Sequence, residues 1–235
     1  MPSPTGTDLN RSLTLIMTFF PCSKLRLAAP LGFAKALILL ALTLPASGQG
    51  QAPALLVMGD SISAAYGMEL RQGWVALLKK RLELTHPNWK VINGSISGET
   101  TAGGLRRLPT LMSTHLPSVV LIELGGNDGL RGYPIDQLQK NLQALAQTAE
   151  AGGARVLIAA MEIPPNFGSR YTTLFRESFA DAADKTDAVL IPFMLADIAT
   201  NPALMQADGI HPTQQAQSTI LDNVWPYIEK ALAAH

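Results

Sequence analysis

Three side chains in the sequence have the types needed for nucleophilic catalysis. Ser61 lies in a Gly-Asp-Ser-Ile-Ser segment, residues 59–63, that directly follows an apolar run. Asp208 and His211 lie three residues apart in an Asp-Gly-Ile-His-Pro segment. An unperturbed imidazole has a pKa of about 6.5, so a histidine is largely neutral at neutral pH and can act as a base. Asp208 can fold back onto the other ring nitrogen and fix its tautomer.

Each of these segments also has an ordinary structural interpretation. Asp60 or Ser61 can be the N-cap of a helix after a tight turn, and the segment is not the Gly-x-Ser-x-Gly elbow of the α/β-hydrolases. The Asp-x-x-His pattern is also compatible with a surface loop and an aspartate at a helix start. The sequence predicts no metal site, because no second cluster of His, Asp or Glu has the spacing of metal ligands.

Two glycine-rich segments contain neutral hydrogen-bond donors. Residues 93–100 read Asn-Gly-Ser-Ile-Ser-Gly-Glu-Thr, and residues 125–129 read Gly-Gly-Asn-Asp-Gly. Glycine lets the backbone approach a ligand, and a free N–H at Gly98, near a helix start, suits a developing negative charge. The Asn127 amide can stabilise an oxyanion without charging the site beforehand. Taken singly, each segment is also an ordinary turn or loop.

The elements that must position these groups follow a strand–helix alternation. Apolar, β-branched runs predict strands, and apolar residues at helical spacing predict helices between them. Strands are expected at 54–58, 91–92, 118–124, 156–160 and 188–191, and helices at 74–82, 100–114, 135–151, 175–185 and 213–234. The last helix contains Pro226, which is expected to kink it or end it early.

This alternation is typical of an α/β fold with a parallel sheet covered by helices on both faces. Ligands of such sheets bind beyond the carboxyl ends of the strands. Neighbouring strands lie about 4.8 Å apart, so we expect Ser61, the Gly98 N–H and the Asn127 amide to reach one reacting carbonyl group. The loop before the last helix would bring His211 to the same place. The agreement of four segments favours a catalytic site over four unrelated turns.

Composition and charge limit the class of protein. The 235 residues include 18 basic and 18 acidic side chains, so the formal net charge is zero, and 47 % of the residues are hydrophobic. The chain is too apolar to be disordered. It lacks the basic clustering of nucleic-acid-binding proteins, so no nucleic-acid partner is expected. Residues 1–50 hold four basic side chains and one acidic one, which leaves 14 basic and 17 acidic, a net of −3, for residues 51–235.

Residues 1–48 have the layout of a secretory signal peptide. Lys35 precedes an apolar run at 36–44, and Ala46 and Gly48 then form the small-x-small pattern of a cleavage site. The run is shorter than the roughly 20 residues of a transmembrane helix. We therefore expect a cleaved leader, the alternative being an uncleaved membrane anchor.

The remaining residues, 49–235, are expected to form one domain, because their number is hardly enough for two cores. Cys22 is the one cysteine of the chain and lies in the leader, so a cleaved protein would contain no disulfide. The long segment before the apolar run suggests that translation starts at Met17. These features predict a periplasmic or secreted protein without a stable membrane span, and they predict no particular oligomeric state.

Four ordered segments resemble the blocks of the SGNH, or GDSL, hydrolase family. They are Gly59-Asp60-Ser61, Gly98, Gly125-Gly126-Asn127-Asp128 and Asp208-Gly209-Ile210-His211. The resemblance extends over residues 53–235 and implies a three-layer α/β/α sandwich with a five-stranded parallel sheet, flavodoxin-like in its topology. It implies that Ser61 is the nucleophile and His211 the general base, oriented by Asp208. It also implies an oxyanion hole made of the Ser61 N–H, the Gly98 N–H and the Asn127 side chain.

The resemblance implies a serine esterase and thioesterase that acts through an acyl-serine and needs neither cofactor nor metal. Its substrates would be small acyl esters or thioesters such as acyl-CoA, lysophospholipids and aryl esters. One alternative is an O-acetylesterase of carbohydrates or cell-wall glycans with the same site. Another is a non-catalytic binding domain that keeps the fold.

Apolar side chains in two loops are candidates for binding an acyl chain. They are Leu130, Tyr133, Ile163 and Phe167, and the alternative for all four is ordinary loop packing. Glu162 makes the second loop more acidic than the resemblance leads us to expect, which bears on the preference for acyl chain or headgroup.

Overall fold

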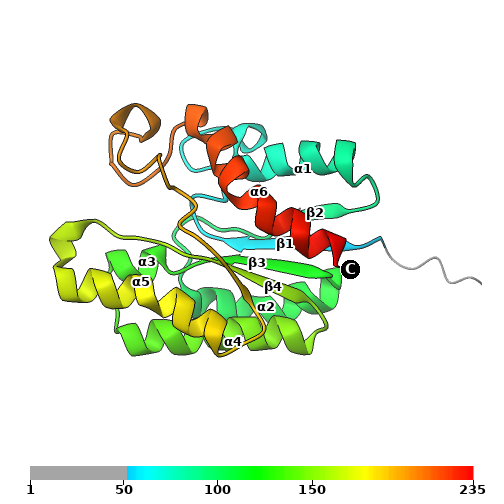
Figure 1. Ribbon diagram of the computed structural model, residues 1–235, viewed down its shortest axis with the longest axis horizontal. Coiled ribbons are helices and arrows are strands. Elements are labelled where there is room, and N and C mark those ends of the chain that lie inside the picture. Colours follow the sequence, from blue (N-terminus) through cyan, green and yellow to red (C-terminus); the bar gives the residue numbers. More distant parts are fainter. Residues whose placement is uncertain (1–51, 235) are drawn as a thin grey trace, which may run out of the picture. The chain divides into compact units, whose positions relative to one another are not determined.

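The computed structural model of the 235-residue chain describes residues 52–234, and Figure 1 shows their arrangement. The predicted leader at 1–48, with Cys22 and the cleavage pattern, lies outside the described residues. Of the domain predicted at 49–235, the structure describes residues 52–234. In residues 52–234, none of the helices is both long enough and apolar enough to cross a membrane.

The centre of the described chain is a five-stranded parallel sheet in the order β2-β1-β3-β4-β5. Its strands are β1 Ala54–Gly59, β2 Lys90–Asn93, β3 Val119–Glu123, β4 Arg155–Ala159 and β5 Val189–Ile191. In the register of β1 and β3, Gly59 pairs with Glu123. The two central strands thus end side by side, and the segments after them begin at the same edge of the sheet.

Helices cover both faces of this sheet (Figure 1). The helices α1 and α6 lie on one face, and α2, α4 and α5 lie on the other. Their bounds are α1 Trp74–Thr85, α2 Thr101–His115, α4 Ile135–Ala151, α5 Ser169–Asp184 and α6 Gln217–Ala233. A short helix, α3 Gly126–Leu130, follows β3 directly. The predicted three-layer α/β/α sandwich with a five-stranded parallel sheet is confirmed.

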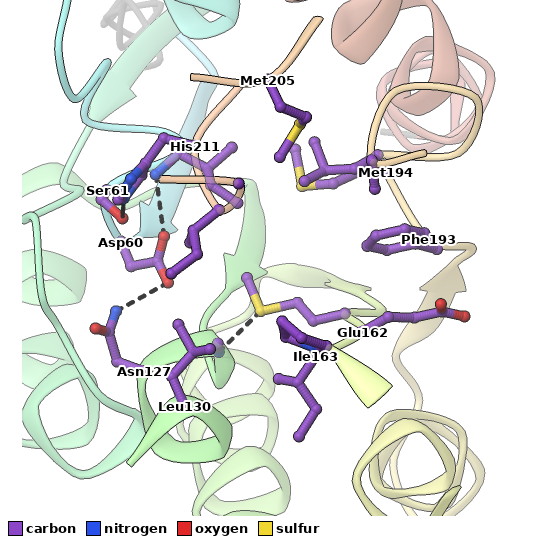
Figure 2. Close-up of a pocket in the computed structure, with 18 of the residues that line it drawn as sticks. Asp60, Ser61, Asn127, Leu130, Glu162, Ile163, Phe193, Met194, Met205 and His211 are labelled. Atoms are coloured by element: carbon purple, nitrogen blue, oxygen red, sulfur yellow. Dashed lines mark hydrogen bonds between the residues drawn. The ribbon is translucent and has the colours of Figure 1, made fainter. Parts of the chain in front are cut away.

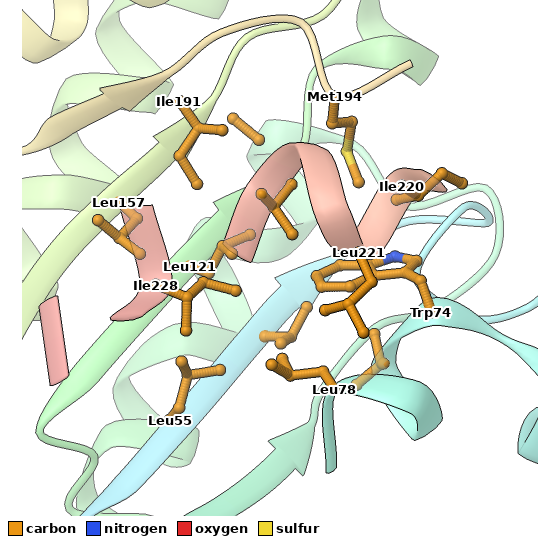
Figure 3. Packing of buried hydrophobic residues seen from close by; sticks show 14 of the residues in the cluster. Leu55, Trp74, Leu78, Leu121, Leu157, Ile191, Met194, Ile220, Leu221 and Ile228 are labelled. Carbon is orange, nitrogen blue, oxygen red and sulfur yellow. The ribbon is translucent and has the colours of Figure 1, made fainter. Parts of the chain in front are cut away.

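Alternation of side chains along the strands creates two apolar cores. Leu55 and Val57 of β1 belong to the core under α1 and α6, whereas Leu56 and Met58 belong to the core against α2, α4 and α5. Successive side chains of a strand point to opposite faces, so a continuous apolar run fills both cores. Figure 3 shows Trp74 of α1 lying against α6 within the first core.

Two local details differ from the sequence predictions. The helix α6 runs through Pro226 to Ala233, so the predicted early end is wrong. Ile228 and Leu232, beyond the proline, are buried in the core, and this packing outweighs one missing backbone hydrogen bond. The helix α5 begins at Ser169 instead of 175, because residues 169–174 are mostly polar and give little apolar periodicity.

Candidate active site

A chain of two hydrogen bonds joins Ser61, His211 and Asp208. Ser61 Oγ lies 2.8 Å from His211 Nε2, and His211 Nδ1 lies 2.6 Å from Asp208 Oδ2. Because a carboxylate can only accept, Nδ1 carries the proton and donates to Asp208. The Nε2 lone pair is then free to accept the hydroxyl proton of Ser61. The structure thus brings together three side chains that the sequence spreads over 150 positions.

The loop that carries His211 is folded around Asp208. Asp208 Oδ1 accepts the backbone N–H groups of Ile210 and His211, at 2.9 and 3.0 Å. Gly209 takes a φ of +66° at the tip of this turn, a conformation that favours glycine. The Gln206 N–H donates to the His211 carbonyl at 2.7 Å, so both sides of the turn are tied. These hydrogen bonds hold the loop that presents the imidazole.

The environment of Asp208 favours its ionised form. Its side chain is 38 % exposed. Partial burial acts to raise the pKa of Asp208, but the hydrogen bonds from the His211 ring and from the His211 and Ile210 N–H groups outweigh it and lower the pKa to about 2. An ionised carboxylate at this position holds the imidazole in one tautomer and compensates an imidazolium.

Asn127 reaches the site from α3. Its Nδ2 donates to Asp60 Oδ2 at 3.1 Å, and Figure 2 shows this bond between two residues that line a pocket. The helix begins after Gly125, whose φ of +125° is left-handed, which turns the chain sharply from β3 into α3. The next N–H, of Gly126, donates to Met161 Sδ at 3.0 Å. The sequence predicted a tight turn here, and the structure adds the short helix.

A buried pair of carboxyl groups lies behind the nucleophile. Asp60 is 3 % exposed and Glu123 is 0 % exposed, and the Asp60 N–H donates to Glu123 Oε2 at 3.2 Å. Ser63 Oγ donates to the same oxygen at 2.6 Å and receives the indole N–H of Trp74 at 3.2 Å. Sequence reasoning missed this pair. The one feature of the sequence that points to this pair is Glu123, an acidic residue at the end of an otherwise apolar run that forms β3.

Burial dominates the acid–base behaviour of both groups. It raises the pKa of Asp60 to about 6, against the lowering effects of the Ile62 N–H, the His211 charge and the Asn127 amide. Burial, and secondly the negative charge of Asp60, raise the pKa of Glu123 well above its usual range. Two carboxyl groups this close together resist ionising at the same time.

Gly98 lies on the loop between β2 and α2. It adopts a left-handed φ of +79°, and its carbonyl accepts Arg131 Nη2 at 3.1 Å. The Ile96 N–H on the same loop donates to the Gly59 carbonyl at 3.1 Å, so the loop runs beside the end of β1. Gly98 is not among the residues that line the pocket at Ser61.

A cavity of about 530 Å³ opens at Ser61, Asn127 and His211 (Figure 2). Of the four side chains predicted to bind an acyl chain, Leu130 and Ile163 line this cavity. Tyr133 and Phe167 lie outside the lining: the Tyr133 carbonyl accepts the hydroxyl of Tyr171, and the Phe167 ring packs 6.4 Å from the Tyr171 ring.

Much of the cavity wall comes from residues that the sequence analysis did not select. They are apolar and include Ile62, Met161, Phe193, Met194, Leu195, Met205 and Ile210. Phe193, Met194 and Leu195 follow β5 almost directly, so the rule that ligands bind beyond strand ends could have found them. Glu162 also lines the cavity, and its carboxylate lies 3.8 Å from Arg176.

Polar groups at the site are not arranged as metal ligands. Within residues 52–234, no group of three or more His, Cys, Asp or Glu side chains could hold a metal ion.

The amino-acid sequence is similar to those of bacterial ester hydrolases. It is 50 % identical to esterase TesA of Pseudomonas aeruginosa over 184 residues, covering 78 % of this chain and 92 % of that protein. It is 42 % identical to the arylesterase of Vibrio mimicus over 178 residues, covering 76 % and 89 %. It is 41 % identical to thioesterase 1/protease 1/lysophospholipase L1 of Escherichia coli K12 over 171 residues, covering 73 % and 81 %.

Solved structures share the fold. The crystal structure of TesA superposes with a TM-score of 0.74 at 50 % identity, covering 76 % of this chain and 99 % of that one. The psychrotrophic esterase EstA of Pseudoalteromonas sp., in a structure inhibited by monoethylphosphonate, gives a TM-score of 0.74 at 43 % identity, covering 77 % and 98 %.

The family model of the GDSL-like lipase/acylhydrolase family matches residues 57–218. This range includes the end of β1, Ser61, the loops that carry Gly98 and Asn127, and the His211 turn. The predicted resemblance is confirmed, and the chain belongs to the GDSL-like lipase/acylhydrolase family.

Proposed function

We propose that this protein is a serine hydrolase that cleaves acyl esters and thioesters through an acyl-serine intermediate on Ser61. The observation that carries the proposal is the hydrogen-bonded chain from Ser61 Oγ through His211 to Asp208, at 2.8 and 2.6 Å, with Ser61 and His211 lining a largely apolar cavity. Relatives named esterase, arylesterase and thioesterase 1 support the reaction class.

The reaction begins when His211 Nε2 takes the hydroxyl proton of Ser61. The serine oxygen attacks the carbonyl carbon of the substrate, and the carbonyl oxygen becomes an oxyanion. When this intermediate collapses, the bond to the alcohol or thiol breaks and His211 gives that leaving group its proton. Water then repeats the sequence on the acyl-serine, which releases the carboxylic acid and the free Ser61 hydroxyl.

The oxyanion needs donors that point into the cavity from more than one element. We assign this role to the N–H groups of Ser61 and Gly98 and to the Asn127 amide. Asn127 and Ser61 line the same cavity, and the left-handed Gly98 stands before α2. Loss of one such donor typically lowers kcat by about 10²–10³-fold, so Asn127→Ala should lose about that much.

The cavity wall indicates the class of acyl group. Its methionine, isoleucine, leucine and phenylalanine side chains, Phe193 among them, offer apolar surface next to Ser61. Such a lining suits a fatty acyl chain better than the hydroxyl-rich ring of an acetylated sugar. The structure thus favours acyl lipids and simple aryl esters over the O-acetylesterase alternative.

The test is a panel of nitrophenyl esters from acetate to palmitate, with octanoyl-CoA, a lysophospholipid and an acetylated xylan. We expect hydrolysis of the acyl substrates and none by Ser61→Ala. Labelling with an alkyl phosphonate and mass spectrometry should place one adduct on Ser61. An adduct on another residue, or full activity of Ser61→Ala, would refute the proposal. Phe193→Ala should raise KM for long-chain esters by about tenfold and leave the acetyl ester unaffected.

We also propose that the enzyme acts in the periplasm or outside the cell after removal of residues 1–48. The apolar run at 36–44 and the small residues at 46 and 48 support this location. N-terminal sequencing of protein recovered from a secreting host should begin at residue 49. A full-length chain retained with the membrane fraction would refute cleavage.

A further inference from the structure

We propose that Asp60 is a positioning residue for this reaction: its carboxylate holds one N–H of the Asn127 amide and thereby aims the other N–H at the oxyanion. The inference rests on the proposed function and goes beyond it, because it gives a task to the buried acid next to the nucleophile.

The two ends of the Asn127 amide would act on an oxyanion in opposite ways. A side-chain amide can turn over and present either its oxygen, which repels an oxyanion, or its two N–H groups. Asp60 Oδ2 lies 3.1 Å from Nδ2, and an ionised carboxylate only accepts hydrogen bonds. Asp60 therefore selects the orientation in which the nitrogen lies at the site, and one N–H remains free for the substrate.

Asp60 is itself held firmly enough to do this. Its second oxygen, Oδ1, accepts the Ile62 N–H at 3.0 Å, and its own N–H donates to Glu123 at 3.2 Å. One oxygen thus fixes the turn that presents Ser61, and the other fixes the oxyanion donor (Figure 2). The two parts of the site are linked through one carboxylate.

The charges around Asp60 allow it to be the ionised member of the buried pair. Two titratable groups face it: Glu123 from the end of β3 and His211 from the loop before α6. Glu123 Oε1 is buried and has no hydrogen-bond partner, and burial favours the neutral form of Glu123. Glu123 then keeps the proton while Asp60 carries the charge, and the imidazolium formed at His211 during the reaction stabilises that charge.

The variant Asp60→Asn tests the proposal because it changes few atoms. Its amide oxygen can still accept the Ile62 N–H, but its NH₂ group would then face the Asn127 NH₂, and two donors repel. Asn127 must turn over and place its oxygen at the site. We expect kcat to fall about 100-fold with KM changed less than about threefold, as for the loss of an oxyanion donor.

A double-mutant cycle separates this role from a structural one. If Asp60 acts through Asn127, the double variant Asp60→Asn/Asn127→Ala should be within about threefold of Asn127→Ala alone. Multiplication of the two losses would overturn the proposal. Asp181→Asn is the matched control, because Asp181 also accepts an amide N–H, from Gln139 at 3.1 Å, and it does not line the cavity. It should retain wild-type kcat.

Two further measurements keep the outcomes distinct. Full activity of Ser61→Ala would refute the proposed function, whereas loss of activity in Ser61→Ala and Asn127→Ala, with wild-type kcat in Asp60→Asn, would refute only the inference. If Asp60→Asn does not fold, the side-chain amide of Asn127 can be followed by NMR in the wild-type protein and assigned by its absence from Asn127→Ala. Its N–H signals should shift as Asp60 ionises near pH 6, and signals that stay constant would overturn the proposal.

Discussion

The carboxyl groups on the two sides of Ser61 behave in opposite ways. On the solvent side, Asp208 is 38 % exposed, accepts three N–H groups around one turn, and has its pKa lowered to about 2. On the interior side, Asp60 is 3 % exposed and burial raises its pKa to about 6. Burial raises the pKa of Glu123, behind it, in the same direction. Three groups of the same chemistry thus differ in their protonation because of where they lie.

The difference suggests a division of labour. A permanently ionised Asp208 suits the proton-transfer side, where a positive imidazolium forms and must be compensated. On the oxyanion side, the buried pair of Asp60 and Glu123 shares one proton and carries a single negative charge. That charge, on Asp60, holds the neutral Asn127 amide. The two sides also differ in construction: Asp208 bonds to residues within three positions, whereas the Asp60–Glu123 contact joins residues 63 positions apart.

The largest effect expected is on the solvent side. Asp208→Asn would place an NH₂ group opposite His211 Nδ1, which favours the tautomer with the proton on Nε2. That tautomer cannot accept the proton of Ser61, so kcat should fall by roughly 10³–10⁴-fold. Steady-state kinetics on a short nitrophenyl ester measures this. A loss below tenfold would mean that Asp208 does not determine the tautomer.

The interior side should respond in stability as well as in rate. Ionised Asp60 is unfavourable in its buried position, and a pKa raised from 3.8 to about 6 corresponds to about 3 kcal/mol above pH 7. Asp60→Asn should therefore raise the free energy of unfolding at about pH 8 by up to that amount, although it lowers kcat. Urea titration monitored by tryptophan fluorescence gives the value. A destabilised variant would contradict the assignment of a costly buried charge.

Opposite pKa shifts also predict opposite pH slopes of stability. The folded state holds a proton on Asp60 between pH 3.8 and about 6 that the unfolded state has released, so the free energy of unfolding falls as the pH rises through this window. Asp208 contributes stability above pH 3.8, which is lost as the pH falls toward about 2.

Unfolding curves collected from about pH 2 to pH 8 test both slopes. Subtracting the curve of Asp60→Asn from that of the wild type isolates the first, and Asp208→Asn isolates the second. A difference curve for Asp60→Asn that is flat between the two pKa values would show that Asp60 is ionised throughout the window.

Much of the fold could be predicted because its signals are local. The helix at 135–151 was predicted to the residue, because its apolar spacing is regular and Gly152 and Gly153 follow it. The continuation of α6 through Pro226 could not be predicted from a local rule, since the energy that keeps the helix comes from Ile228 and Leu232 in the core. Low helix propensity at a proline predicts the end of a helix poorly when the helix residues before and after the proline are buried.

Some residues of the site could likewise be predicted from the sequence, and others could not. The grouping of Ser61, Asp208 and His211 could be predicted, because strand ends of a parallel sheet meet at one edge and each group follows its own turn pattern. The Asp60–Glu123–Asn127 network could not, because Glu123 reads as part of an apolar strand and its contacts depend on the register that pairs Gly59 with Glu123. The far wall of the cavity was missed since Phe193 and Met194 look like core residues in sequence.

The smallest effect expected concerns the aromatic contact on the solvent side. The ring of Tyr66 lies 4.3 Å from the imidazole of His211 at an interplanar angle of 33°, and Tyr66 is 50 % exposed. Such a contact is worth about 0.5–1.5 kcal/mol, so Tyr66→Ala should lower kcat by about 2–13-fold. Tyr66→Phe keeps the ring and should stay close to wild type. If both variants lose the same activity, the hydroxyl rather than the ring supports His211, and the solvent side would then depend on polar contacts alone.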